Sequence, residues 1–461
     1  MTAAVLPART TRRSVGLGAF RVLVASTYVV YIAVSFFRTE NFLFALDALL
    51  VVAVLYALMS RAFAERTVAH GYLLLLLTLY VGSVLFAWVV LSPPGELASL
   101  KTLRNLLYCA GVFIVTLTYV TDRARLASLV RLMAMLSVFS AFYGLRQAVF
   151  GFWGFELDRL ALMGSSLQEM LTLGRARLTS TFGDPLLCGF FMMAGLFLFR
   201  ARWYVCDLSA WAKRFYQVGA FATFAVLVAS LTRAPLLGFA VGVVAVLATD
   251  FRLTRRSLAR IGWAVIAGLI FLGAVVWVVE SGMLAGSENP VIRFLDTGLS
   301  SVWSLIVLFS AGGDESTYFL VGQSRDQRLA AWTAGIAYLS SYPLGAGFSN
   351  AGLFGFSLGD AGLLQVALLI GVPGATAYLT IIAMVFFRGY GHLRRTERTD
   401  HRRAISALLG LWIAILVTTG ISSLATTSVA SVITWLVAGA LVNVRRIFPI
   451  ERTTTISGAI S

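Results

Sequence analysis

Long apolar runs separated by short polar links make up most of this chain. Stretches such as 71–92 and 261–281 hold about 20 residues with no charge except at their ends, enough to cross a hydrocarbon core of about 30 Å. The pattern predicts an all-α polytopic membrane protein of about 12 transmembrane helices. The predicted spans are 17–37, 42–60, 71–92, 102–120, 128–150, 185–200, 214–232, 234–249, 261–281, 360–387, 404–422 and 425–444.

The basic residues divide unevenly between the links. With the N-terminus placed inside, about two thirds of the 37 Lys and Arg side chains fall in inner links and termini. This asymmetry predicts a membrane protein with cytoplasmic tails at 1–16 and 447–461 and a single transmembrane domain at 17–446. Topology then accounts for most of the net charge of +16, so we expect no nucleic acid partner.

The N-terminal stretch "RTTRRSVGLGAF" vaguely resembles a twin-arginine signal. No convincing cleavage site follows it, and Arg21 interrupts the apolar run. We therefore predict an uncleaved first helix.

Two predicted outer loops, 151–184 and 282–359, are much longer than turns. The first begins "GFWGFELDRL", in which alternating aromatic and acidic residues predict an interfacial helix. The second contains "SRDQRLAAWTAGIAYLSSYP", which predicts an amphipathic helix that ends before Pro343. Loops of this length in a compact fold are often functional.

Cysteine and histidine offer no site in these outer loops. Cys109, Cys188 and Cys206 have no metal-ligand spacing, and the first two lie in or near apolar runs. All three histidines fall in predicted inner links. We expect no metal and no other cofactor, so chemistry on the outer face would have to proceed without histidine.

Four outer stretches concentrate charge at the predicted membrane edge. They are "RARLTSTFGDP" with Arg175, Arg177 and Asp184, "SLTRAPLLG" with Arg233, "GQSRDQRLAAW" with Arg325 and Arg328, and "GFSLGDAGLLQ" with Asp360. Arginine is permanently charged, and its planar fork suits phosphate. Several arginines and one carboxylate would suit a membrane-anchored diphosphate substrate. The diphosphate would leave while the carboxylate deprotonates an incoming hydroxyl.

Each stretch also has a purely structural interpretation. Arg233 at a span end can snorkel to the headgroups, and the other arginines can be ordinary loop charges. Asp360 can cap its helix, where an acid accepts unpaired N–H groups and favours the helix dipole. Asp47 is the one carboxylate deep in a predicted span, whereas proton-coupled carriers often use such acids. The clustered outer charges favour transfer chemistry over transport.

In order and spacing, the four stretches resemble the O-antigen ligase and repeat-unit (Wzy-type) polymerase family over roughly residues 177–374. "RLTSTFGDPLLCGFF" is similar to the family's Arg…Phe-x-Asn/Asp-Pro stretch, and "SLTRAPLLGF" to its Ser/Thr-Arg-Gly/Ala segment. "RLAAWTAGIAYLSSYPLGAGFSN" is similar to its Arg-x3-Trp…Pro-x-Gly-x-Gly stretch. "DAGLLQVALLIGVPG" resembles the next block, in which an acceptor-activating residue precedes a Gly-x-x-Gly break in a helix.

The resemblance implies a GT-C-like, inverting, metal-independent membrane glycosyltransferase. It would polymerise undecaprenyl-diphosphate-linked oligosaccharide repeat units of O-antigen, capsule or exopolysaccharide on the outer face of the bacterial inner (plasma) membrane. Its partners would be the lipid-linked donor and acceptor, membrane lipid and a chain-length regulator. Arg177, Arg233 and Arg328 would hold the diphosphate, with Arg175 and Arg325 as alternatives in the same stretches.

Asp360 stands where the ligases of this family carry a histidine. It would be the catalytic base or orienter for the acceptor hydroxyl, and this departure favours a polymerase over a lipid A-core ligase. Two alternatives stay open: a ligase that transfers glycan to a lipid or protein acceptor, and a non-enzymatic transporter or flippase of polyprenyl-linked sugars. Pro373 in "GVPG" predicts a kink after Asp360.

Overall fold

The computed structural model describes twelve stretches of the chain, and every structural statement below concerns these residues. They are 24–25, 41–60, 71–92, 97–162, 178–206, 208–230, 232–250, 330, 332–348, 362–422, 424 and 428–450. The elements with assigned bounds are α2 (Asn41–Leu58), α4 (Gly71–Val90), α5 (Leu97–Tyr119), α6 (Arg123–Phe150), α7 (Gly154–Leu162), the 3₁₀ turn η1 (Ser180–Phe182), α9 (Pro185–Val205), α10 (Ala210–Ala229), α11 (Arg233–Asp250), α15 (Gly362–Arg395), α16 (Thr399–Gly420), α17 (Ser428–Val442) and α18 (Val444–Ile447).

Seven of these helices contain stretches long and apolar enough to cross a membrane: α4, α5 from Thr102 onward, α6, α9, α11, α15 and α16. Shorter apolar stretches occupy Asp47–Leu58 of α2 and Ala430–Val442 of α17. The described chain is therefore an all-helical polytopic membrane protein, as predicted. The total of about 12 spans and the GT-C-like architecture stay predictions. Predicted span 261–281 and nearly all of 17–37 lie outside the described residues.

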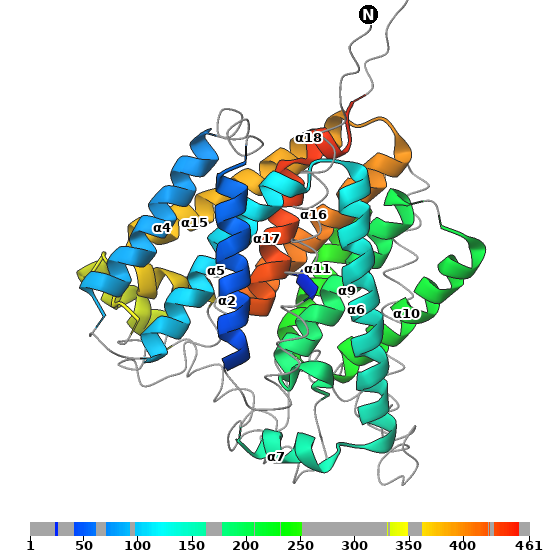
Figure 1. The fold of residues 1–461 in the computed structure, drawn as a ribbon, viewed down its shortest axis with the longest axis horizontal. Helices are drawn as coiled ribbons and strands as arrows, with labels where there is room; N and C mark the ends of the chain where they lie inside the picture. The colour runs from blue at the N-terminus through cyan, green and yellow to red at the C-terminus, as the bar shows by residue number, and fades with distance from the viewer. Residues whose placement is uncertain are drawn as a thin grey trace, which may run out of the picture.

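Helix α9 lies in the middle of the bundle and contacts α6, α10, α11, α16 and α17 (Figure 1). From Pro185 to Phe199 its sequence is apolar on all sides, which is the pattern of a helix buried on all sides. Small residues allow other helices to approach closely. A Cβ atom on Gly242 of α11 would lie 2.7 Å from the carbonyl oxygen of Gly410 on α16. Such small-residue contacts let helix backbones pack against each other within a membrane.

Neighbouring helices run in alternating directions, which gives the bundle two ends. Arg123 at the start of α6 donates to the carbonyl oxygen of Val205 at the end of α9 (2.9 Å). Arg402 near the start of α16 donates to the carbonyl oxygen of Thr249 at the end of α11 (2.9 Å). Helices α18 and α7 mark the two ends in Figure 1. We call these the α18 end and the α7 end.

Helix α15 is broken near its first third. Gly371 has φ 74° and ψ 174°, so its backbone leaves the helical conformation. The chain at 343–346 fills the break: Ala346 N–H donates to the Leu368 carbonyl oxygen (2.7 Å), and Val372 N–H to the Pro343 carbonyl oxygen (2.8 Å). The predicted kink in "GVPG" is confirmed, but the non-helical residue is Gly371.

The helical segment 332–341 leads into this turn, so the predicted end before Pro343 is confirmed. After the turn, Phe348 N–H donates to Ser92 Oγ at the end of α4 (2.8 Å). The turn therefore ties α4 to α15.

Candidate functional site

Most of the predicted site residues lie outside the described part of the chain. Arg175, Arg177, Arg325, Arg328 and Asp360 are all in this group. Their roles as diphosphate ligands and as catalytic base stay predictions.

Arg233 is the exception among the predicted site residues: it is the first residue of α11 and is half-buried. The predicted break between 214–232 and 234–249 is confirmed as a break between two helices, although only the second of them, α11, is long and apolar enough to cross a membrane. Helix α10 ends at Ala229, and Ser230 and Thr232 form the turn, with their hydroxyl oxygens 2.7 Å apart.

The structure brings the described flanks of the four charged stretches to one end of the bundle. Leu178 N–H donates to the Ala229 carbonyl oxygen (3.5 Å), which joins the first stretch to the turn before Arg233. Thr418 of α16 donates to the carbonyl oxygen of Ala234 (3.3 Å).

Near the contact between Thr418 and Ala234, the last residue of α16, Gly420, lies close to the start of α15. A Cβ atom added to Gly420 would lie 3.8 Å from the Leu363 side chain. A Cβ on Gly335 of segment 332–341 would lie 3.2 Å from Leu364. The C-terminal end of α16 therefore lies between the flanks of these stretches, an arrangement that sequence order alone does not show.

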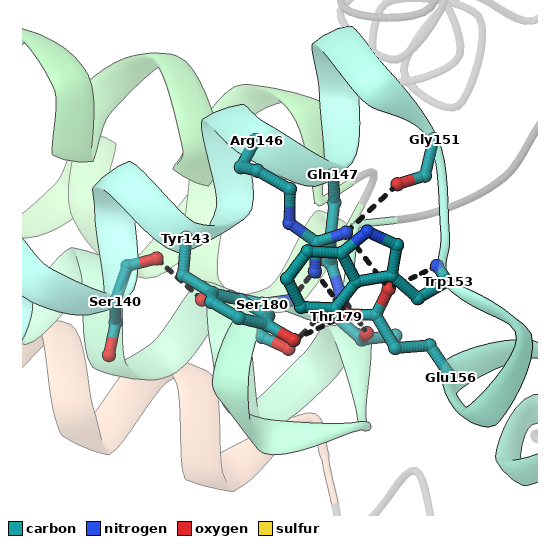
Figure 2. Close-up of polar contacts among 9 residues, drawn as sticks. All are labelled: Ser140, Tyr143, Arg146, Gln147, Gly151, Trp153, Glu156, Thr179 and Ser180. Carbon is teal, nitrogen blue, oxygen red and sulfur yellow. Dashed lines mark hydrogen bonds and ion pairs between the residues drawn. The ribbon is translucent and has the colours of Figure 1, made fainter.

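The densest polar cluster in the described chain centres on Glu156, at the α7 end (Figure 2). Glu156 belongs to the short helix α7, which confirms that the predicted interfacial segment is helical. Its side chain is only 5% exposed. Arg146 of α6 binds both carboxylate oxygens, at 2.6 and 3.1 Å. Tyr143 and Gln147 also donate to Glu156, each at 2.7 Å, and the Trp153 amide donates at 2.6 Å.

Aromatic rings cover the guanidinium of Arg146. Its Cζ atom lies 3.7 Å from the centroid of the Trp153 ring and 4.5 Å from that of Tyr143. Burial raises the pKa of Glu156, but the hydrogen bonds from Arg146, Tyr143, Trp153 and Gln147 outweigh burial and hold it below its ordinary value. The cluster is therefore an ion pair whose carboxylate is almost fully buried and whose guanidinium keeps 17% exposure.

Gln147 extends the cluster to η1. Its Oε1 atom accepts a hydrogen bond from the Ser180 amide (2.7 Å), and Ser180 Oγ donates to the Ser140 carbonyl oxygen (2.5 Å). Ser180 has φ 50°, an uncommon conformation for a residue other than glycine. These bonds hold the strained turn that leads into α9. The cluster thereby fixes both described ends of the predicted outer loop 151–184 to α6.

Sequence reasoning did not find this cluster. Its two charges were visible, since Arg146 lies near a span end and Glu156 lies in the interfacial segment. The glycine at 151, with φ 76°, reverses the chain between them and allows the pairing. In chemical terms every oxygen of Glu156 is occupied, so the arrangement joins α6, α7 and η1.

A second charged group lies where the apolar stretches of α2 and α5 begin. Asp47 of α2 and Arg104 of α5 approach to 3.9 Å and are partly buried. The Tyr108 hydroxyl, one turn further along α5, interacts with the Asp47 carboxylate. The sequence singled out Asp47 as the one deep carboxylate, and the structure supplies its partners.

Comparison with known proteins gives one local similarity. No family model matches the chain. A stretch of 165 residues is 28% identical to NADH-quinone oxidoreductase subunit N of Cutibacterium acnes (strain DSM 16379 / KPA171202). It takes in 33% of this chain and 30% of that protein, so the chain spans less than a third of the relative it matches.

This similarity contradicts the predicted function. It points to a subunit of an oxidoreductase and away from a glycosyltransferase that polymerises or ligates undecaprenyl-linked glycans, so that prediction was wrong. The physical reason lies in the signals used. Apolar spans, basic inner links and arginines at span ends follow from membrane topology alone, so they do not distinguish one class of polytopic protein from another. The family resemblance itself stays untested.

Proposed function

We propose that this chain is an integral membrane subunit of a larger assembly. The observation that carries the proposal is the similarity to a protein named as a subunit, NADH-quinone oxidoreductase subunit N. The described helices support it because two of their charged pairs are engaged in contacts between helices. Glu156 is enclosed by α6 and α7, and Asp47 is paired with Arg104.

Large apolar side chains on two helices are available for contacts with neighbouring subunits or lipid. On α4, Tyr72 is 81% exposed and Val89 is 68% exposed. On α11, Val244 is 64% exposed. In the proposed assembly, helices of other subunits cover part of this surface.

We further propose that the Asp47–Arg104 pair carries the function of the subunit within the membrane. Ionisable residues in spans are costly and are generally retained for a functional reason. Tyr108 adds a hydroxyl next to the carboxylate. This group differs from the Glu156 cluster because both of its charged side chains keep some exposure, 20% for Arg104 and 27% for Asp47.

The test is purification of the tagged full chain, expressed at its natural level and extracted with a mild detergent. Native electrophoresis and mass spectrometry should find it in a complex several times larger than its own 49.9 kDa, with a fixed set of other proteins in constant stoichiometry. In-gel NADH oxidation should coincide with the tagged band. Recovery as a monomer or a homo-oligomer would overturn the proposal.

Asp47→Asn separates assembly from activity. It should leave the complex intact and lower its quinone reductase activity several-fold. The matched control is Glu397→Gln, at an exposed acid between α15 and α16, which should leave both unchanged. Equal activity in the two variants would contradict the functional role of Asp47. It would not affect the proposal that the chain is a subunit.

A further inference from the structure

The α18 end of the bundle carries a concentrated group of arginines on two neighbouring helices. Arg388 and Arg395 belong to the last turns of α15, and Arg445 belongs to α18. Arg388 is half-buried, and the other two are exposed. Helices α15 and α18 contact each other. We call these three residues the arginine triad.

The two triad members on α15, Arg388 and Arg395, lie on the same helix face as His392. Arg388, His392 and Arg395 are separated by four and three residues, so they lie along one face of the helix. Arg445 acts electrostatically on both Arg388 and His392, and Arg395 acts on His392. The three arginines therefore lie near the C-terminal part of α15, where α18 packs against it.

Contacts below the surface hold α18 in this position. Asn443, just before α18, donates to the carbonyl oxygens of Leu117 and Val120 at the end of α5, at 2.9 and 2.8 Å. His392 Nε2 lies 2.7 Å from the Phe448 carbonyl oxygen, just after α18. The like charges of the triad are thus brought together by the fold.

Nearby aromatic residues place the triad at headgroup depth. Phe387 is 67% exposed and Tyr390 is 38% exposed. The ring of Tyr390 stacks on Phe386, and Arg394 lies over its face at 5.9 Å. Exposed aromatic rings at the end of a membrane-spanning helix typically lie at the level of the lipid headgroups. Arg388, two turns before the end of α15, can reach the same level by snorkelling.

Two arginines of the triad, Arg395 and Arg445, are not neutralised by described carboxylates. No carboxylate among the described residues forms an ion pair with Arg395 or Arg445, and Glu397 and Asp400 are exposed beyond the end of α15. His392 is 1% exposed, yet its Nδ1 atom has no hydrogen-bond partner within the described part of the chain. An anion between α15 and α18 would compensate the charge.

We propose that the arginine triad binds the phosphate of an anionic phospholipid in the leaflet at the α18 end. Guanidinium groups suit phosphate because they form paired hydrogen bonds and are weakly hydrated. Basic pockets between membrane helices are a known setting for anionic headgroups. The lipid's acyl chains would lie along the apolar surface that includes Phe387. This binding site is independent of the proposed subunit function.

The experiment is native mass spectrometry of the detergent-purified full chain, titrated with phosphatidylglycerol and, separately, with phosphatidylcholine. We expect at least fivefold stronger retention of phosphatidylglycerol. Arg395→Gln/Arg445→Gln should lower that preference at least threefold, and Arg395→Lys/Arg445→Lys should keep part of it. The matched control is Arg131→Gln/Arg214→Gln, which removes the same charge from exposed positions of α6 and α10 at the same end.

Three outcomes would overturn the proposal. The first is equal retention of the two lipids. The second is an equal loss in the triad and control variants, which would indicate general charge attraction. The third is displacement of the lipid by low-millimolar pyrophosphate, which would indicate a site for a free phosphate compound. Melting temperatures of all variants, measured alongside, distinguish lost binding from lost folding.

Discussion

Glu156 shows how a charged residue becomes part of the fold. An isolated carboxylate is expensive to bury, but this one accepts hydrogen bonds from three side chains and one backbone amide. Arg146 supplies a bidentate pair, the geometry in which arginine and carboxylate bind most strongly. Breaking such a pair leaves one buried charge uncompensated. The resulting loss of stability can be measured with single-residue variants.

Truncating either partner should therefore destabilise the protein. We expect Arg146→Ala and Glu156→Ala each to lower the free energy of unfolding by about 3 kcal/mol, because each leaves a buried charge unpaired. The double variant should lower the free energy of unfolding by less than the sum of the two single-variant losses, with a difference of about 1–3 kcal/mol. Denaturation in detergent micelles measures the cycle, and hydrogen exchange at Gly154–Leu162 reports release of α7.

The control for this cycle lies away from the cluster. Glu397→Ala, at an exposed position between α15 and α16, should change stability by less than about 0.5 kcal/mol. Fully additive single-variant effects would show that Arg146 and Glu156 act separately, contrary to the contacts in Figure 2.

At the scale of elements, the break in α15 depends on a glycine and on a distant turn. The φ and ψ angles of Gly371 lie in a region that is open essentially to glycine only. A Cβ atom there would lie 2.5 Å from the carbonyl group of Leu344. Pro373 lacks an N–H and so weakens the same helix, but the turn at 343–346 binds the backbone groups at Leu368 and Val372.

Gly371→Ala should consequently be the damaging substitution in this helix. We expect a loss of about 2–3 kcal/mol from backbone strain and the clash with Leu344. Gly391→Ala, in the same helix, should be neutral or stabilising by up to about 1 kcal/mol, because no atom lies within 4 Å of its added Cβ. Melting temperatures in one detergent measure both. A larger loss from Pro373→Ala than from Gly371→Ala would place the origin of the break at the proline.

At the scale of the whole molecule, the alternation of helices places α7 and α18 at opposite ends of the bundle (Figure 1). Combined with the basic residues of the inner links, this arrangement predicts that α18 faces the cytoplasm. The buried Phe448, 1% exposed, shows that the packed chain continues beyond α18, two residues into the predicted tail.

Cysteine labelling tests this topology. A membrane-impermeant maleimide applied to intact cells should label Gly154→Cys, at an exposed site in α7, and should label Arg446→Cys only after permeabilisation. Both variants are made in a Cys206→Ser background, because the other two cysteines are buried. Labelling of both sites in intact cells, or of position 446 alone, would contradict cytoplasmic placement of α18.

Apolar periodicity alone located the spans that the structure describes, because a hydrocarbon core requires a fixed length of uncharged helix. It also located the helix in "GFWGFELDRL" and the break in "GVPG", since aromatic–acid alternation and the Gly/Pro content are local signals. Function was not determined this way. The charges that suggested glycosyl transfer follow equally from topology, and the similarity to an oxidoreductase subunit contradicts that prediction.

What the sequence by itself determined is thus membrane insertion and the local course of the helices, because both depend on residues close together along the chain. The tertiary structure alone decided which charges meet. Arg146 pairs with Glu156 across a reversal at Gly151, and Asp47 meets Arg104 across two helices. Arg388 and Arg445, which surround the proposed lipid site, are 57 positions apart, and packing of α15 against α18 brings them together. Side-chain pairing between distant segments depends on helix packing, which no local pattern encodes.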